Sequence, residues 1–404
     1  MPAKTVAQRC YDKYFPIEQL PAHFRDDIDA LAGHFLANGT FQGYFIEGLV
    51  PWDDLAGEPN GGHAAVGDFL LTAGAYAALS ANFDTLIEQW CKQHKVAFRG
   101  ALNSVQANAY AMKARPLLKF HGCMDVDRPN TVWTQGQLTA EPTQDRIASC
   151  RGWMIDHLPE KDLLIVGFWT DWAYLNEVLQ GLLHGQNPGS VTVIDPLPTA
   201  QLADKAPDLW ATVSGLPNFS HVSMSSDEAL AELRAEFSRV WVRRLMALGA
   251  PLYEVGGGDC PVEHLQCPDL DPDALYDLRR DGEGKSYMRA ARTRTPSDEA
   301  GLVALARMLL LDAGAVVEGP WLRLNDDAIR VVNGQNRSLR KMEDAHNEAA
   351  SSGTADIIIA AGAYDGVLPG NVVRAGGDKR ITRSSRGGPS RWVTLDQARE
   401  TLGL

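Results

Sequence analysis

The sequence lacks long apolar runs, and none approaches the roughly 20 residues that a membrane-spanning helix requires. Its first residues, MPAKTVAQRCYDKYF, also lack the charged-then-apolar pattern of a secretory signal. We therefore expect a cytoplasmic protein with no membrane partner.

Cysteine and positive charge are both scarce. The chain has 6 Cys in 404 residues and no C-x-x-C pair, which predicts reduced thiols and no structural zinc. Asp and Glu number 51 against 38 Lys and Arg, a formal net charge of -13. Such a balance argues against sequence-independent binding of nucleic acid through a basic face.

Apolar residues are plentiful, at 45% of a chain long enough for two cores. The patterns predict a first domain over residues 1–250, a linker over 251–290 and a small C-terminal domain over 291–404. The linker is expected because residues 256–284 are acidic and have glycine clusters at both ends.

Short apolar runs alternate with helical patterns in the first domain. Runs such as LLIV and VTVI are continuous rather than alternating, which favours parallel strands buried on both faces. The fold class predicted is α/β, with a doubly wound, mostly parallel, Rossmann-like sheet. The expected strands are Ala77–Ser80, Leu117–Phe120, Leu163–Val166 and Val191–Ile194. The expected helices are Ala64–Ala73, Thr85–Lys95 (with a capping box from Thr85 to Glu88), Gln144–His157, Trp172–Leu183 and Ser226–Leu248, which ends at Gly249-Ala250-Pro251.

The C-terminal region predicts a second, smaller α/β or α+β domain, to which no role is assigned. Its expected elements are a helix at Ser297–Ala313, strands at Trp321–Leu324, Ile329–Val332 and Ile357–Ala361, and a strand–helix pair at Trp392–Leu402.

Polar residues follow the first two expected strands, at the sheet edge where open parallel sheets bind ligands. Asn82 and Asp84 follow the first, and His121 and Gly122 follow the second. A His in this position can act as a general base near neutral pH. The alternatives are that Asn82 or Asp84 caps the next helix and that His121 is a hydrogen-bonded structural residue.

Two further strand ends carry candidate ligand-binding residues. Gly167 and Phe168 follow the third strand, where a glycine permits close approach of a ligand to the backbone. Asp195 and Pro196 follow the fourth, and an acid there suits the hydroxyls of a ribose. The alternatives are an ordinary strand–turn–helix joint and an Asp-Pro turn.

Together these segments resemble the sirtuin superfamily, in order and spacing, over residues 58–230. Pro59-Asn60-Gly61-Gly62-His63 is similar to the family's P-N-x-x-H helix start. The other matches are Asn82-Phe83-Asp84 to N-I-D, Phe120-His121-Gly122 to L-H-G, Val166-Gly167-Phe168 to V-x-G-x-S, and Ile194-Asp195 to I-N/D.

The resemblance implies a site that cleaves NAD at the nicotinamide–ribose bond. Asp84 would accept a hydrogen bond from the nicotinamide carboxamide, and Asn82 would position the ribose or the attacking water. His121 would take a proton from a ribose hydroxyl or from the nucleophile. The remaining cofactor-binding residues implied are Gly122, Gly167 and Phe168 behind the cofactor, with Asp195 and Pro196 at the adenosine ribose.

The chain departs from the family at two points. It has no glycine-rich G-A-G-x-S loop to hold the pyrophosphate, so we expect either a coding sequence that starts further upstream or weak NAD binding. It also lacks the two C-x-x-C pairs of the deacylase branch.

The departures favour the zinc-free bacterial type, in which water attacks the ribose to give ADP-ribose and nicotinamide, as in antiphage defence. The alternatives are an NAD-dependent protein deacylase or ADP-ribosyl transferase, and an inactive module that binds a nucleotide or a partner. The protein partners left open are a second copy of the chain and a partner ATPase or other defence protein.

Overall fold

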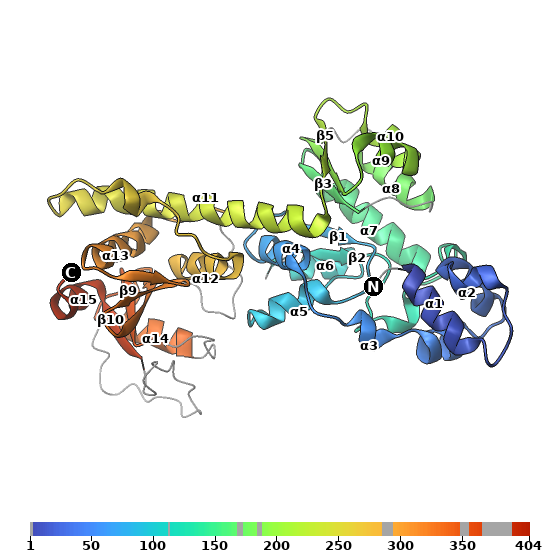
Figure 1. Ribbon diagram of the computed structural model, residues 1–404, viewed down its shortest axis with the longest axis horizontal. Helices are drawn as coiled ribbons and strands as arrows, with labels where there is room; N and C mark the ends of the chain where they lie inside the picture. The colour runs from blue at the N-terminus through green and yellow to red at the C-terminus, as the bar shows by residue number, and fades with distance from the viewer. Residues whose placement is uncertain are drawn as a thin grey trace. The chain divides into compact units, whose positions relative to one another are not determined.

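The computed structural model describes residues 3–111, 114–167, 173–183, 188–284, 294–347, 355–365 and 390–404 (Figure 1). It divides into two compact units. The first unit comprises Met1–Leu70, Ala75–Trp90 and Phe98–Leu230, and the second comprises Leu71–Gly74, Cys91–Ala97 and Ala231–Leu404. No helix within the described ranges is both long and apolar enough to span a membrane.

The first unit is an α/β structure whose five strands pair only in parallel within the described residues. The strands are β1 (Ala78–Ser80), β2 (Leu117–Lys119), β3 (Leu163–Val166), β4 (Val191–Asp195) and β5 (Phe219–Ser223). β1 pairs with β2, and a second sheet has the order β3-β4-β5. The expected strands are confirmed, and β5 was not foreseen.

Ten helices surround these strands in the described part of the first unit, and α11 begins there. They are α1 (Ala3–Tyr14), α2 (Ile28–Ala37), α3 (Trp52–Leu55), α4 (Gly61–Leu71), α5 (Leu86–Gln93), α6 (Ser104–Tyr110), α7 (Thr143–His157), α8 (Ala173–Leu183), α9 (Thr199–Lys205) and α10 (Pro207–Val213). A π-helical stretch covers Phe41–Leu49.

Separate apolar clusters attach these helices to the two sheets. Leu118 of β2 packs with Trp153 of α7, and Val178 of α8 touches the same cluster. Ile165 of β3 packs with Leu179 of α8. Helix α8 therefore contacts the apolar clusters of both sheets.

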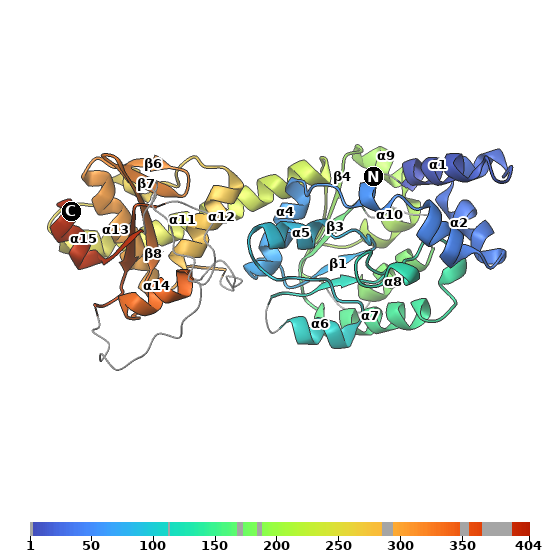
Figure 2. The same cartoon turned by 90° about the horizontal axis from the view of Figure 1, so that it is seen from below.

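The second unit is built on a mixed five-stranded sheet in the order β10-β9-β8-β7-β6 (Figure 2). Helix α13 covers one face with an apolar cluster that includes Val303 and Ile359, and α14 covers the other through Met342. Its strands are β6 (Val316–Glu318), β7 (Trp321–Leu324), β8 (Asp327–Asn333), β9 (Ile357–Ala361) and β10 (Arg391–Thr394). Its helices are α11 (Ser226–Val255, beginning in the first unit), α12 (Pro272–Gly282), α13 (Gly301–Asp312), α14 (Leu339–Asn347) and α15 (Leu395–Leu402).

Two expectations about residues 248–284 are wrong. Helix α11 does not stop at Gly249 but continues through Pro251 to Val255. A Cβ at Gly249 would lie 2.5 Å from the Cβ of Ala304, so this glycine allows close packing on α13 rather than ending the helix. The segment expected to be a loose surface linker contains α12, of which residues 278–282 are buried.

The buried face of α12 carries an ion pair to the sheet. Nε of Arg330 in β8 donates to Oδ2 of Asp281 at 2.9 Å, and both side chains are 2% exposed. Charges this deeply buried are tolerated because each is the partner of the other. The pair therefore holds α12 against β8.

Removing one partner should destabilise the second unit strongly. We expect Asp281→Ala to lower the free energy of unfolding by about 3–5 kcal/mol, because the buried Arg330 loses the carboxylate that pairs with it. The matched control is Glu318→Ala, which breaks the exposed Arg323–Glu318 pair and should cost far less stability, because solvent screens that pair. Urea denaturation measures both, and similar losses for the two variants would contradict the role given to the buried pair.

Candidate functional site

The segment that follows β1 presents Asn82 and Asp84. Asn82 is exposed, and its backbone N–H donates to Oγ of Ser80 at 3.0 Å. Oδ1 of Asp84 accepts the N–H of Leu86 at 3.2 Å, so Asp84 does cap α5. The capping alternative therefore holds for one oxygen of Asp84.

The expected capping box between Thr85 and Glu88 does not form. Oε1 of Glu88 accepts the N–H of Gly100 at 3.2 Å and lies 2.9 Å from Nζ of Lys119. The Glu88 carboxylate binds a buried ammonium group rather than the backbone of its own helix, and Asp84 accepts the first N–H of that helix.

The loop that follows β2 turns sharply at Gly122. His121 is 7% exposed, and its backbone carbonyl accepts the N–H of Val132 at 2.9 Å. Gly122 has a φ of +94°, and a Cβ there would lie 3.1 Å from Cα of Thr131. The turn therefore requires glycine for both its backbone angle and the approach of residue 131.

Three contacts fasten the loop after β2 to the segment after β1. The ring of His121 hydrogen-bonds to the backbone of Ala81. The N–H of Met124 donates to the carbonyl of Phe83 at 2.8 Å, and Nζ of Lys119 donates to the carbonyl of Asp84. The structure thus brings the segment carrying Asn82 and Asp84 against the one carrying His121.

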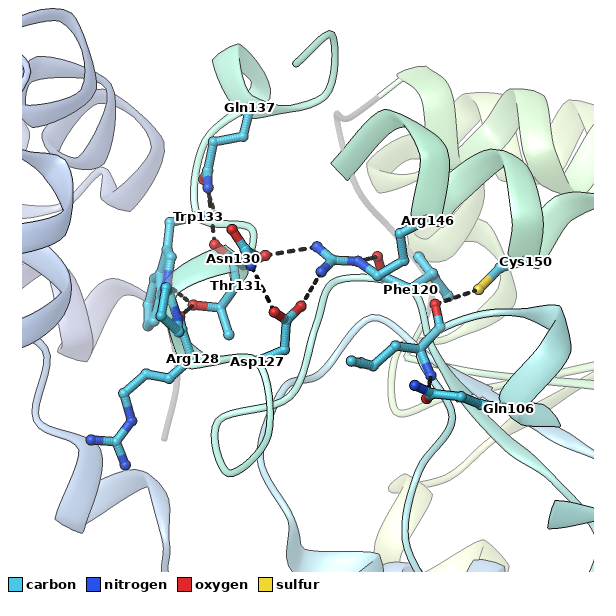
Figure 3. Close-up of polar contacts among 12 residues, drawn as sticks. Gln106, Phe120, Asp127, Arg128, Asn130, Thr131, Trp133, Gln137, Arg146 and Cys150 are labelled. Atoms are coloured by element: carbon cyan, nitrogen blue, oxygen red, sulfur yellow. Dashed lines mark hydrogen bonds and ion pairs between the residues drawn. The ribbon is translucent and has the colours of Figure 1, made fainter. Parts of the chain in front are cut away.

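Arg146 of α7 holds the other side of this loop (Figure 3). Its Nε donates to the carbonyl of Phe120 at 2.9 Å, and Nη2 donates to the carbonyl of Asn130 at 2.7 Å. Nη1 forms an ion pair with Asp127, and Asn130 donates to the same carboxylate at 2.7 Å. One guanidinium therefore fixes both ends of the stretch 120–130.

The next part of the loop packs on the site through aromatic rings. The ring centroids of Trp133 and Phe83 are 4.4 Å apart. Nε1 of Trp133 donates to Oγ1 of Thr131 at 2.8 Å, and Gln137 donates to the carbonyl of Thr131 at 3.0 Å (Figure 3). These contacts pack the loop against Phe83, the residue between Asn82 and Asp84.

The surroundings of His121 keep its ring neutral. Burial lowers the pKa of this imidazole to about 3, and the positive charge of Arg146 acts in the same direction. The hydrogen bond to Ala81 acts in the opposite direction, as expected for a ring N–H that donates to a carbonyl. The other ring nitrogen then carries a lone pair at neutral pH.

The helix start that contains His63 lies within electrostatic reach of the same site. Oδ1 of Asn60 accepts the N–H of His63 at 3.1 Å, and the N–H of Gly62 donates to Asp227 at 2.7 Å. Burial lowers the pKa of His63, and the negative charges of Asp84 and Asp227 oppose that shift. Asn60 thus starts α4 near Asp84.

The remaining predicted residues lie at the ends of the second sheet. Gly167 has a φ of +58°, and no atom of the described residues lies within 4 Å of a Cβ built there. Asp195 is 3% exposed, and its Oδ1 accepts the N–H of Leu197 at 2.9 Å. Pro196 is exposed, and Phe168 lies outside the described residues.

Two cationic residues of the site were missed from the sequence, namely Lys119 and Arg146. Lys119 interrupts an apolar run, Leu117-Leu118-Lys119-Phe120, and a charge inside such a strand signals a buried partner. Arg146 carried no comparable signal, because its contacts lie 16 to 26 residues away in the chain.

A cavity of about 280 Å³, lined by Ser190, Val191 and Asn218 among others, lies at the amino ends of β4 and β5, opposite the ends that carry the predicted site residues.

A scan of the chain against models of known protein families gives no match, and a search of curated proteins gives none either. Across the described ranges, no group of three or more His, Cys, Asp or Glu side chains gathers to hold a metal ion. The function of the chain is therefore inferred from the geometry of the site.

The turn at Gly122 provides a test of how tightly this loop is closed. Gly122→Ala should cost more stability than Gly167→Ala, although both positions have positive φ. Backbone strain alone costs about 1–2 kcal/mol at each position. At Gly122 the added methyl group also meets Thr131, whereas at Gly167 it meets no atom of the described residues. Equal losses in urea denaturation would show that the loop is not closed as described.

The neutral His121 should make stability depend on pH. Its pKa of about 3 in the folded chain lies below the ordinary 6.5, so between these values the unfolded chain binds more protons and stability falls as the pH falls. Replacing it, as in His121→Asn, should reduce this slope by about one proton. The free energy of unfolding at several pH values from 4 to 6.5 measures the slope, and equal slopes would contradict a buried neutral imidazole.

Proposed function

We propose that the protein binds NAD at the carboxyl ends of β1 and β2 and hydrolyses its nicotinamide–ribose bond in the cytoplasm. The observation that carries this proposal is the set of contacts joining residues 81–84 to residues 119–124. It supports a site in which a neutral imidazole lies beside an amide and a carboxylate. These are the groups that the resemblance to sirtuins assigns to this reaction.

The reaction breaks the bond between the anomeric carbon and the nicotinamide nitrogen, and the electron pair leaves with neutral nicotinamide. Positive charge then develops on the ribose, while the carboxylate of Asp84 accepts a hydrogen bond from the carboxamide of the departing nicotinamide. Water adds to the anomeric carbon and loses a proton, giving ADP-ribose.

The low pKa of His121 limits the proton transfers that this residue can perform in the reaction. An imidazole with a pKa of about 3 is too weak a base to generate hydroxide from free water. It can accept a proton from the much more acidic oxygen that forms when water joins the ribosyl cation. His121 therefore acts as the proton acceptor after the nicotinamide bond has broken.

We also propose that the two parallel sheets are halves of one doubly wound sheet. Within the described residues β1 pairs with β2 alone and β3 with β4 alone, so each half has an unpaired edge strand. Leu164 and Val166 on β3 are 44% and 36% exposed, an unusual state for apolar strand residues. A further parallel strand between β1 and β3 would pair with both edge strands and complete the arrangement.

Incubation of the purified chain with NAD tests the function. We expect release of nicotinamide and ADP-ribose in equal amounts without an acylated peptide, and loss of about 100-fold or more in kcat for Asn82→Ala and His121→Ala. The matched control is His157→Ala, because His157 stacks on Trp153 of α7 away from this site. Its turnover should stay near that of the unchanged chain.

The same assay separates the other functions. Turnover that appears only with an acylated peptide indicates a deacylase, and ADP-ribose attached to protein indicates a transferase. Neither turnover nor an NAD-dependent rise in the unfolding temperature would contradict NAD binding, because a ligand of the folded state must stabilise it.

A further inference from the structure

A buried lysine lies at the centre of the contacts between the two loops. Lys119 is the last residue of β2 and is 1% exposed, although its neighbours in the strand are apolar. Its Nζ lies 2.9 Å from Oε1 of Glu88 and donates to the backbone carbonyl of Asp84. It thus links a strand end, a helix and the segment that carries two of the candidate catalytic residues.

The surroundings of this ammonium group are built closely around it. A Cβ on Gly100 would lie 2.8 Å from Cδ of Lys119 and 3.0 Å from Oε1 of Glu88. The N–H of Gly100 donates to that same oxygen at 3.2 Å. The lysine stem therefore has little freedom, and the position of its amine is determined.

We propose that Lys119, held by Glu88, is a positioning residue that fixes the Asp84 backbone, and with it the Asn82–Asp84 segment, against the loop of His121. This inference rests on the proposed function, because Lys119 positions catalytic residues only if the Asn82–Asp84 segment and His121 act on NAD. The pair connects the two reactive segments through one amine. His121 lies two residues after Lys119. The Asn82–Asp84 segment and the loop of His121 are therefore both attached to the carboxyl end of β2.

Stability alone does not explain the pair. Well-packed uncharged residues of similar size often replace a buried ion pair with little or no loss of stability. An uncharged pair would not supply a donor to the Asp84 carbonyl. A merely structural role and a positioning role therefore predict different outcomes for the same double variant.

The test is the double variant Lys119→Met/Glu88→Gln. It leaves no unpaired charge, and the Gln amide oxygen can still accept the N–H of Gly100. We expect it to fold with an unfolding temperature near that of the unchanged chain, while kcat for NAD falls by about 100-fold and KM changes little. Lys119→Leu/Glu88→Leu is measured alongside as a second uncharged pair. The control is Lys92→Met, an exposed lysine on the same helix as Glu88.

Amide hydrogen exchange measures positioning without any substrate. The N–H groups of Met124 and Leu86 report on the segment, because they donate to Phe83 and to Asp84. We expect both to exchange about tenfold faster in a folded double variant. Unchanged kcat together with unchanged exchange in either folded variant would overturn the proposal.

Nicotinamide release and amide exchange together distinguish failure of the proposed function from failure of this inference. If the unchanged chain releases no nicotinamide, NAD hydrolysis is wrong, and the exchange rates still decide whether Lys119 positions the segment. Faster exchange of Met124 and Leu86 then supports positioning, and unchanged exchange refutes it.

Discussion

Two loops that follow neighbouring parallel strands can hold a reactive geometry only if their backbones are fixed to each other. In the first unit this is done by a few polar contacts in a mostly apolar setting. The amine of Lys119 must find acceptors because it is buried, and the acceptors available are the Glu88 carboxylate and the Asp84 carbonyl. Because the buried ammonium group must bind these two acceptors, it fixes the position of the backbone that carries Asp84.

The same principle governs the far side of the loop. The guanidinium of Arg146 is buried among the carbonyls of Phe120 and Asn130 and the carboxylate of Asp127. Its positive charge then acts on His121 and, together with burial, keeps that imidazole neutral. Arg146 therefore both holds the loop and lowers the proton affinity of His121.

The sequence revealed the strands and the residues at their ends because continuous apolar runs and strand-end polar residues are local signals. It did not reveal β5, because Phe219-Ser220-His221-Val222-Ser223 is neither a continuous apolar run nor a regular alternation of polar and apolar residues. Nor did it reveal α12, where Arg280 and Asp281 resemble a surface pattern yet are buried. The Asp281 carboxylate pairs with a residue 49 positions away in the chain, and no local pattern predicts such a partner. Arg146 was missed for the same reason, because its partners are also distant in the sequence.

The most direct test is a crystal structure of the His121→Ala variant with NAD bound. The expected result is a dinucleotide across the carboxyl ends of β1 and β2, with the anomeric carbon of the nicotinamide ribose between Asn82, Asp84 and the position of the missing imidazole. The distance from the Asn82 side chain to that carbon, or to a water molecule beside it, should be within about 3.5 Å. A dinucleotide bound elsewhere on the first unit, with these residues remote from the ribose, would contradict the account.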